Sequence, residues 1–186
     1  MATYIALLRG INVGGNNKIK MAELRHTLTA LGLSRVQTYI QSGNVLFDAE
    51  EPEETLQSRI EQAIKADFGI ELKVVLRKAE ELRQVAANCP FSAAEVQEAA
   101  ASCRGECLHV AFLTGIPAQE GIDKVDSYKS ASDDYRIIGR EVYLLFRSSI
   151  LDSKLANNLH KLGVSATVRN WKTLSKLVSM ADEMEA

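Results

Sequence analysis

The sequence has too few cysteines for a fold held together by disulfides. Only three occur among 186 residues, an odd number without a framework spacing, so reduced thiols in the cytoplasm are the simplest interpretation. No apolar run approaches the ~18–20 residues that a membrane-spanning helix needs. Residues 1–4 lack the basic segment and cleavage site of a signal peptide. The sequence therefore predicts a cytoplasmic protein that does not enter a membrane.

An excess of charge of either sign is also missing. The net charge is −2 and the pI is near 6, so no global field attracts nucleic acid or an anionic membrane. The charge is uneven along the chain, because residues 1–47 carry a net +4, residues 48–71 a net −6 and residues 136–176 a net +6. The two basic blocks either frame an anion site or neutralise the acidic block across the surface.

Motifs of the common functional classes are absent as well. No Ser or Cys stands in a nucleophile-elbow pattern, and no pair of carboxylates stands out from the acidic segment 50–61. The aromatic motif of RNA-recognition domains is missing, which argues against sequence-specific binding of nucleic acid. Cys103, Cys107 and His109 are metal-ligand types, but their spacing matches no common zinc site, so no metal site is predicted. The sequence thus identifies no general base, nucleophile or cofactor, and it leaves open whether the protein is an enzyme.

What the sequence does contain is an alternation of apolar patterns typical of strands and helices. The hydrophobic content of 46% and the charged content of 25% are those of a globular protein. Apolar positions in the first half predict, in order, a strand at 3–8, a helix at 21–31, a strand pair at 36–40 and 45–47, a helix at 56–68 and a strand at 72–76.

The second half repeats this order. It is predicted to contain a strand at 108–113, a helix at 117–125, a strand pair at 135–138 and 142–146, a helix at 155–162 that Asp152 caps, and a strand at 166–168. Residues 6–11 (ALLRGI) also match residues 111–116 (AFLTGI) in order and partly in identity. The pattern therefore favours an internal duplication.

A β-α-β-β-α-β unit is the ferredoxin-like plait, so the predicted fold class is α+β with two ferredoxin-like subdomains and antiparallel sheets. We expect an N-terminal subdomain at 1–78, a helical connector at 79–104 and a C-terminal subdomain at 105–186 that ends in a helix. Strands such as 4–8 are apolar on both faces, which is typical of burial on both sides. The second face is then covered by the other half, by the connector or by a second copy of the chain in a homodimer.

The segment between the first strand and the first helix is the strongest candidate for a binding site. Glycines let backbone N–H groups converge on a ligand, and a helix N-terminus with nearby lysines favours an anion. The spacing from Gly10 to Gly15 fits a P-loop, but Asn16 and Asn17 stand where its Lys and Ser/Thr would be. A wide turn with several positive-φ residues is the alternative. The candidate ligand-binding residues here are Arg9, Gly10, Asn12, Gly14, Gly15, Asn16, Lys18 and Lys20.

Two shorter clusters are further candidates. The hairpin segment 39–44 contributes Gln41, which is expected to share a strand face with Tyr39, and Asn44, although turn chemistry alone explains Asn44. The segment at 169–171 contributes Arg169, Asn170 and Trp171. Arg169 could hold a carboxylate or phosphate while Trp171 forms a stacking wall. Alternatively, Trp171 anchors the core, Arg169 forms a surface ion pair and Asn170 caps the last helix.

Three segments resemble the bacterial family of proteins of unknown function called DUF1697. They read LLRGINVGGNNKIKM (7–21), TYIQSGNVLF (38–47) and SKLANNLHKLGVSATVRNW (153–171), and the resemblance extends over the full length. It implies an α+β fold with two ferredoxin-like subdomains, but no activity, substrate or catalytic residue. The chain departs from the family pattern at Lys172, where Asn is more frequent, and at residues 147–150.

Three functions follow as hypotheses of different classes. The leading one is binding of a small anionic ligand, carrying a phosphate or carboxylate, at the glycine-rich loop. The second is a protein-interaction or scaffold role without catalysis. The third is weak, non-specific binding of nucleic acid through the basic block at 136–176, which salt would weaken steeply.

Overall fold

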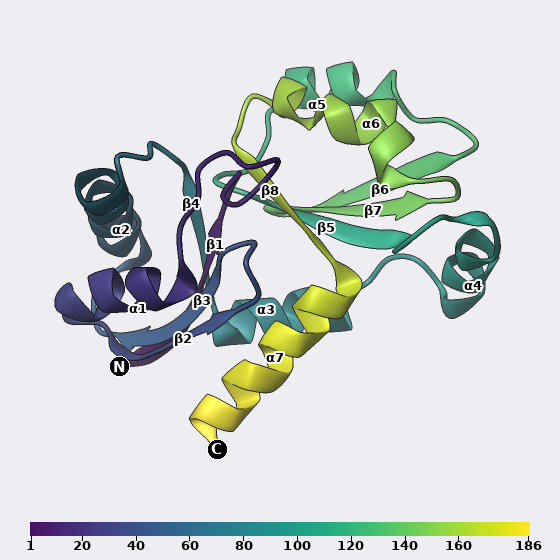
Figure 1. The fold of residues 1–186 in the computed structure, drawn as a ribbon. Coiled ribbons are helices and arrows are strands. Elements are labelled where there is room, and N and C mark those ends of the chain that lie inside the picture. Colours follow the sequence, from purple (N-terminus) through teal and green to yellow (C-terminus); the bar gives the residue numbers. More distant parts are fainter. The chain divides into compact units, whose positions relative to one another are not determined.

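Each half of the chain forms a four-stranded antiparallel sheet in the computed structural model, which describes residues 1–186 (Figure 1). The strand orders are β2-β3-β1-β4 and β6-β7-β5-β8. In both, the first and third strands of the half lie at the centre, as in a ferredoxin-like plait. The strands are β1 (Ala2–Leu8), β2 (Ser34–Tyr39), β3 (Asn44–Ala49), β4 (Val74–Lys78), β5 (Leu108–Leu113), β6 (Asp133–Ile138), β7 (Glu141–Phe146) and β8 (Ala166–Asn170). The predicted α+β fold with two similar subdomains is confirmed.

The helices complete the β-α-β-β-α-β order of each half. They are α1 (Met21–Ala30), α2 (Glu53–Phe68), α3 (Ala79–Ala87), α4 (Ala93–Ser102), α5 (Gln119–Asp126), α6 (Lys154–Asn157) and α7 (Trp171–Glu185), with 3-10 helices η1 (Ile150–Asp152) and η2 (Leu159–Leu162). The residues group into two compact units, Met1–Gln84 with Ser175–Ala186, and Val85–Leu174. The segment 79–104, expected as a helical connector, contains α3 and α4, and the end of α7 belongs to the first unit.

In the first unit, α1 and α2 cover one face of the sheet (Figure 1). Leu24 of α1 and Ile60 of α2 are fully buried in one cluster with Ala6, Val45 and Leu76. Ala6 is paired with Val45 on β3 and with Leu76 on β4, so the three residues lie in one row across the sheet. Apolar residues that recur about every 3.6 positions on the helices therefore pack against apolar residues that recur every second position on the strands. Together they form one buried apolar layer.

In the second unit, helices α5 and α6 with η2 pack on the corresponding sheet face. Leu155 of α6 and Leu159 of η2 join Ala111 and Val142 in one buried cluster. The opposite face of this sheet is also covered, since Tyr143 donates a hydrogen bond to the Val85 carbonyl at 2.7 Å and its ring lies 6.4 Å from that of Trp171. The apolar character of both strand faces is therefore explained by burial within the chain itself.

Local structure departs from the sequence prediction at the predicted helix 155–162. The segment breaks into α6 and η2, and Ser153 rather than Asp152 caps it, because the Ser153 hydroxyl accepts the Ala156 N–H at 3.0 Å. Ser153 also donates to buried Asp133 at 2.9 Å. That tertiary bond favours Ser153 over its neighbour as the cap. A capping box formed by Ser92 and Glu95 begins α4.

Close packing of α5 on η2 generates a first test of the fold. Gly121 is buried on α5, and a Cβ atom there would lie 2.8 Å from the Leu162 carbonyl carbon. We expect Gly121→Ala to lower the free energy of unfolding by roughly 1–3 kcal/mol, because overpacking a rigid backbone outweighs the better helix propensity of alanine. Urea unfolding measures this change.

Gly115→Ala is the matched control, since the nearest atom to its added Cβ lies 3.9 Å away and its φ is not positive. The control is expected to unfold within about 0.5 kcal/mol of the wild type. Equal stability of the Gly121 and Gly115 variants would contradict the close contact between α5 and η2.

Candidate functional site

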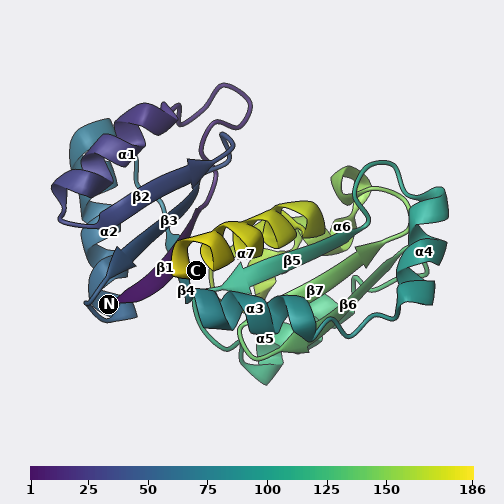
Figure 2. The same ribbon diagram turned by 90° about the horizontal axis from the view of Figure 1, so that it is seen from below.

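The glycine-rich loop, residues 9–20, joins β1 to α1 and lies beside the β2–β3 turn (Figure 2). It turns back on itself through residues in the left-handed region of φ, and the Asn16 N–H donates to the Val13 carbonyl at 2.9 Å. The residues with positive φ are Gly10 (72°), Asn12 (54°), Gly14 (58°), Gly15 (80°) and Asn17 (50°). Glycine and asparagine adopt this region at least cost, so the composition of the loop follows from its backbone path. The wide turn with several positive-φ residues is thus present.

Asn12 fastens the loop to its surroundings through its side-chain amide. Its Nδ2 donates to the carbonyls of Ile19 at 3.0 Å and Gln41 at 2.7 Å, and its Oδ1 accepts the Ile19 N–H at 2.9 Å. The Asn17 amide adds a bond to the Gly10 carbonyl at 3.1 Å. These bonds join the base of the loop to the hairpin turn, so the amide of Asn12 serves the shape of the loop.

A cleft of about 550 Å³, which we call the lysine cleft, opens between this loop, the hairpin turn and the start of α1. It contains five of the candidate residues predicted from the sequence. Its lining residues are Asn12, Gly15, Lys18, Ile19, Lys20, Glu23 and Gln41. Lys18 and Lys20 are exposed and form no ion pair, so both ammonium groups are available to an anion.

The N-terminus of α1 reaches the same cleft. Lys20 is the N-cap residue, and no side chain caps the first turn. The first intrahelical bond runs from the Leu24 N–H to the Lys20 carbonyl, so the N–H groups of the first turn are left without intrahelical partners. Such groups and the helix dipole favour an anion. Glu23 in the first turn is the one acidic residue among the lining residues of this cleft.

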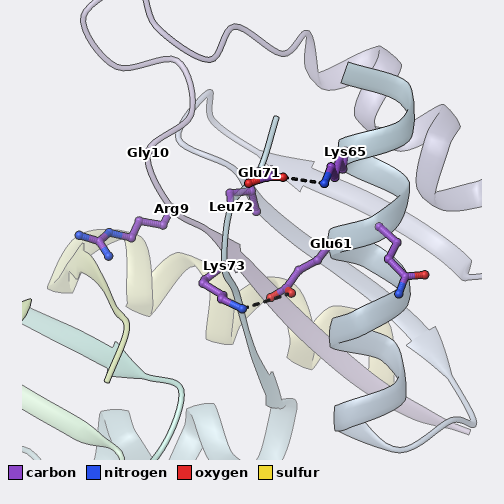
Figure 3. A pocket seen from close by; sticks show the side chains of 8 residues that line it. Arg9, Gly10, Glu61, Lys65, Glu71, Leu72 and Lys73 are labelled. Atoms are coloured by element: carbon purple, nitrogen blue, oxygen red, sulfur yellow. Dashed lines mark ion pairs between the residues drawn. The ribbon is translucent and has the colours of Figure 1, made fainter. Parts of the chain in front are cut away.

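A second cleft of about 550 Å³, the ion-pair cleft, lies on the other side of the loop base, between α2 and the approach to β4 (Figure 3). Arg9 and Gly10 line it together with Glu61, Gln62, Lys65, Glu71, Leu72 and Lys73. Its lysines are paired, Lys65 with Glu71 at 2.6 Å and Lys73 with Glu61 at 3.9 Å. The Arg9 side chain points away from both pairs (Figure 3). The two lysines of this cleft are less available to a ligand, because each already has a carboxylate partner.

A third cleft of about 490 Å³, the polar cleft, runs along α1 towards the end of α2. Its lining residues are Ala22, Glu23, His26, Thr27, Asp67 and Phe68. Thr27 donates to Asp67 at 2.6 Å. Sequence reasoning missed Glu23, His26, Thr27 and Asp67 as site residues. The available signal was their spacing, because positions 23, 26 and 27 share one side of a helix.

Two residues of the hairpin segment differ in position from the sequence expectation. Asn44 is fully buried, and its Nδ2 donates to the Tyr39 carbonyl and the Ser42 hydroxyl, both at 3.0 Å. Gln41 is exposed in the turn and does not share a strand face with Tyr39, because β2 ends at Tyr39 and Ile40 takes a φ of 50°. The expected shared face is therefore wrong, although Gln41 does line the lysine cleft.

The predicted residues at 169–171 belong to the second unit, whereas the glycine-rich loop belongs to the first. Neither unit by itself contains both groups. Asn170 caps α7, as predicted, by accepting the Thr173 N–H at 2.8 Å. Arg169 is partly buried, and burial lowers its pKa to about 10, so the guanidinium keeps its charge at neutral pH. Trp171 is half-buried against Tyr143.

A family model described as "Protein of unknown function (DUF1697)" matches residues 1–143. The chain belongs to this family. The match contains the glycine-rich loop and all three clefts, while the third motif, 153–171, lies beyond it. No curated protein matches the chain.

Among solved structures, this DUF1697 chain is similar to a conserved bacterial protein from Streptococcus pneumoniae. The two share 25% sequence identity, with a TM-score of 0.74, and the alignment covers 97% of this chain and 98% of the other. The likeness therefore extends over both four-stranded sheets, including the part beyond the family match. No helix of the structure combines the length and apolar character that crossing a membrane requires.

His109 is a buried titratable group outside the three clefts. It lies on β5 with its ring 5.4 Å from that of Phe146, and its Nδ1 has no hydrogen-bond partner. Burial lowers its pKa to about 4. No group of three or more His, Cys, Asp or Glu side chains is arranged to hold a metal ion, so we treat His109 as a neutral core residue.

The lowered pKa of His109 predicts a pH-dependent stability. The unfolded chain binds a proton on this residue below about pH 6.5, whereas the folded chain does so only near pH 4. The unfolded state therefore binds more protons between these values, and stability falls as the pH drops through this window. At pH 5 we expect a loss of roughly 2 kcal/mol from this group, because one pKa unit corresponds to 1.36 kcal/mol.

Urea unfolding of the wild type and His109→Leu at pH 7.5 and pH 5 measures this loss. The variant is expected to lose less stability than the wild type between the two pH values. His160→Leu is the control for the loss of a histidine at an exposed position. Identical pH dependence in the wild type and His109→Leu would contradict a buried neutral His109.

The three bonds of Asn12 predict a local loss of stability on their removal. We expect Asn12→Ala to lower the free energy of unfolding by roughly 1–3 kcal/mol, because the Ile19 N–H and two carbonyls lose their partner and alanine tolerates positive φ less well than asparagine. Asn16→Ala is the matched control, because no side-chain bond of Asn16 holds the loop. Faster amide hydrogen exchange at Ile19 in the Asn12 variant alone is the local readout. Unchanged exchange there would mean that Asn12 does not hold the loop.

Proposed function

We propose that the lysine cleft binds a small ligand through an anionic group, either a phosphate or a carboxylate. The observation that carries this proposal is the convergence on one cleft of two unpaired lysines and an uncapped helix N-terminus. Lys18 and Lys20 supply full positive charges, and the first turn of α1 supplies N–H donors and the positive end of the helix dipole. Glu23 opposes an anion, so the lining residues carry one net positive charge.

The geometry of the loop supports this function. A ligand site is more effective when its groups are held in place before binding, because less conformational entropy is lost. The bonds of Asn12 to Ile19 and Gln41 fix the chain on both sides of Lys18 and at the opposite wall of the cleft. The volume of about 550 Å³ lies in the usual range for small-molecule sites.

We propose binding rather than a reaction, because the lining residues of the lysine cleft include no Ser, Thr, Cys or His. A metabolite sensor or carrier and an enzyme that completes its site with a second substrate are both compatible with such a cleft. Of the other residues predicted from the sequence, Arg9 and Gly10 line the ion-pair cleft and Asn44 is buried. The proposed anion site is therefore smaller than the sequence suggested, with Gly15, Lys18, Lys20 and Gln41 as its centre.

The two other functional hypotheses have less support. An interaction role was motivated by strands that are apolar on both faces, and the chain covers those strands by itself. Nucleic-acid binding was motivated by the basic block at 136–176. Two arginines of that block form ion pairs within the second unit, Arg136 with Glu95 at 3.2 Å and Arg147 with Glu98 at 3.4 Å.

Two features of the chain as a whole accompany the proposal. The equivalent strand orders of the two sheets support an origin by internal duplication. Three free cysteines support a cytoplasmic location, where thiols stay reduced.

Binding of inorganic phosphate and acetate, followed by thermal shift, tests the proposal. For the anion that binds, a concentration of ten times the Kd stabilises the protein by about 1.4 kcal/mol, which raises Tm by roughly 3–6 °C in a chain of this length. We expect Lys18→Ala to abolish this shift and to keep the Tm of the free protein, since Lys18 is exposed.

Lys176→Ala is the matched control, because Lys176 is an exposed lysine of the first unit that lines none of the clefts. The control should respond to the anion as the wild type does. Equal Tm shifts in the Lys18 and Lys176 variants would rule out the proposed site. The site would also be ruled out if the Tm of the wild type changed with neither anion and with neither nucleotides nor sugar phosphates.

A further inference from the structure

The lysine cleft and the polar cleft are neighbours on the same helix. Both are lined by Glu23 of α1. From this shared wall, one cleft extends to Lys18 and Lys20 and the other to Thr27 of α1 and Asp67 of α2. The two clefts, of about 550 and 490 Å³, therefore meet at Glu23 on α1.

The two compartments differ in the sign of their charge. Beyond Glu23, the polar cleft contains the carboxylate of Asp67 and the imidazole of His26 but neither lysine nor arginine. Glu23 and Asp67 form no ion pair, and the one hydrogen bond of the Asp67 carboxylate is that from Thr27. Two carboxylates without a cationic partner favour a positive group in a ligand. The half-buried ring of Phe68 adds an apolar and cation-binding surface.

We propose that the ligand of this protein is bipolar, with an anionic group in the lysine cleft and an amine in the polar cleft. This inference rests on the proposed function, because it assumes that the anionic group occupies the lysine cleft. The ligand class is an aliphatic molecule that carries a phosphate or carboxylate at one end and a protonated amine at the other.

The helix sets the distance between the two groups. Lys20 and Thr27 are seven residues apart on α1, which corresponds to about 10 Å at a rise of about 1.5 Å per residue. Glu23 lies between them, at about 5 Å from Lys20 by the same rise. An amine that reaches Asp67 beside Thr27 is therefore separated from the anion by about 10 Å, the length of an extended chain of six carbons with its end groups.

A matched pair of probes tests this inference without knowledge of the natural ligand. The probes are 6-aminohexyl phosphate and hexyl phosphate, which share the anion and the carbon chain and differ in the amine. We expect the amino compound to bind the wild type roughly five times more tightly in isothermal titration calorimetry, because two partly exposed ion pairs each contribute less than a tenfold change. Inorganic phosphate is titrated in parallel as the probe of the lysine cleft alone.

Charge-removing variants locate the amine. Asp67→Asn removes one carboxylate but keeps an oxygen that can accept the hydrogen bond from the Thr27 hydroxyl, so the fold should persist. Glu23→Gln removes the second carboxylate. In both variants the preference for the amino compound should shrink while binding of hexyl phosphate stays the same or tightens. Glu54→Gln is the control, because Glu54 is an exposed acid on α2 that lines neither cleft, and it should keep the full preference.

The outcomes separate this inference from the proposed function. If hexyl phosphate and phosphate bind the wild type but the amino compound binds no more tightly, the anion site stands and the bipolar ligand is wrong. The same conclusion follows if the preference survives in both Glu23→Gln and Asp67→Asn. If neither phosphate nor either hexyl compound binds, the anion site and the bipolar ligand are both wrong.

Discussion

The amide of Asn12 is the contact on which the candidate site depends. It bonds to Ile19 at the end of the same loop, 7 residues further along the chain, and to Gln41 in the hairpin turn, 29 residues further along. The bonds therefore join the loop to a second segment that is distant in sequence. The loop from β1 to α1 contains three glycines, and without these bonds few contacts would restrain it. With them, Lys18 and Lys20 flank a buried, hydrogen-bonded Ile19, and the start of α1 faces a wall of defined shape.

The distribution of ion pairs distinguishes clefts that are otherwise of equal size. The ion-pair cleft and the lysine cleft each contain two lysines, but the ammonium groups of Lys65 and Lys73 have glutamate partners, whereas those of Lys18 and Lys20 do not. An anion entering the ion-pair cleft would compete with carboxylates already in place, while an anion entering the lysine cleft meets N–H groups of α1 and free lysines. Pairing, rather than volume, therefore selects the site.

Much of the fold could be predicted from the sequence because it depends on periodicity. The apolar stripe at Leu24 and Leu28 encodes the buried face of α1. The unbroken apolar runs of β3 and β7 encode burial on both faces of a sheet, and these patterns repeat in the two halves. The cap at Ser153 could not be read in the same way, because Asp152 has an equally suitable side chain and only the tertiary bond to Asp133 decides between them. The register of the hairpin turn was missed at Ile40, a β-branched residue with positive φ that sequence propensity does not anticipate.

The candidate site was only partly accessible to sequence reasoning. Glycines and lysines marked the loop, but the role of Asn12 depends on a partner in a different hairpin, and the polar cleft depends on Asp67, 40 residues after Thr27. No local pattern predicts such pairs. Membership of DUF1697 and the similar streptococcal structure establish the family and the fold, so the function has to be tested at the cleft itself.

The most direct test is a titration of ¹⁵N-labelled protein with inorganic phosphate, followed by the backbone amide signals. We expect the largest shifts at residues 18–24, around the first turn of α1, and at Gln41 on the opposite wall. Shifts confined to residues 61–73 of the ion-pair cleft, or no shift at any amide, would contradict the assignment of the anion site to the lysine cleft.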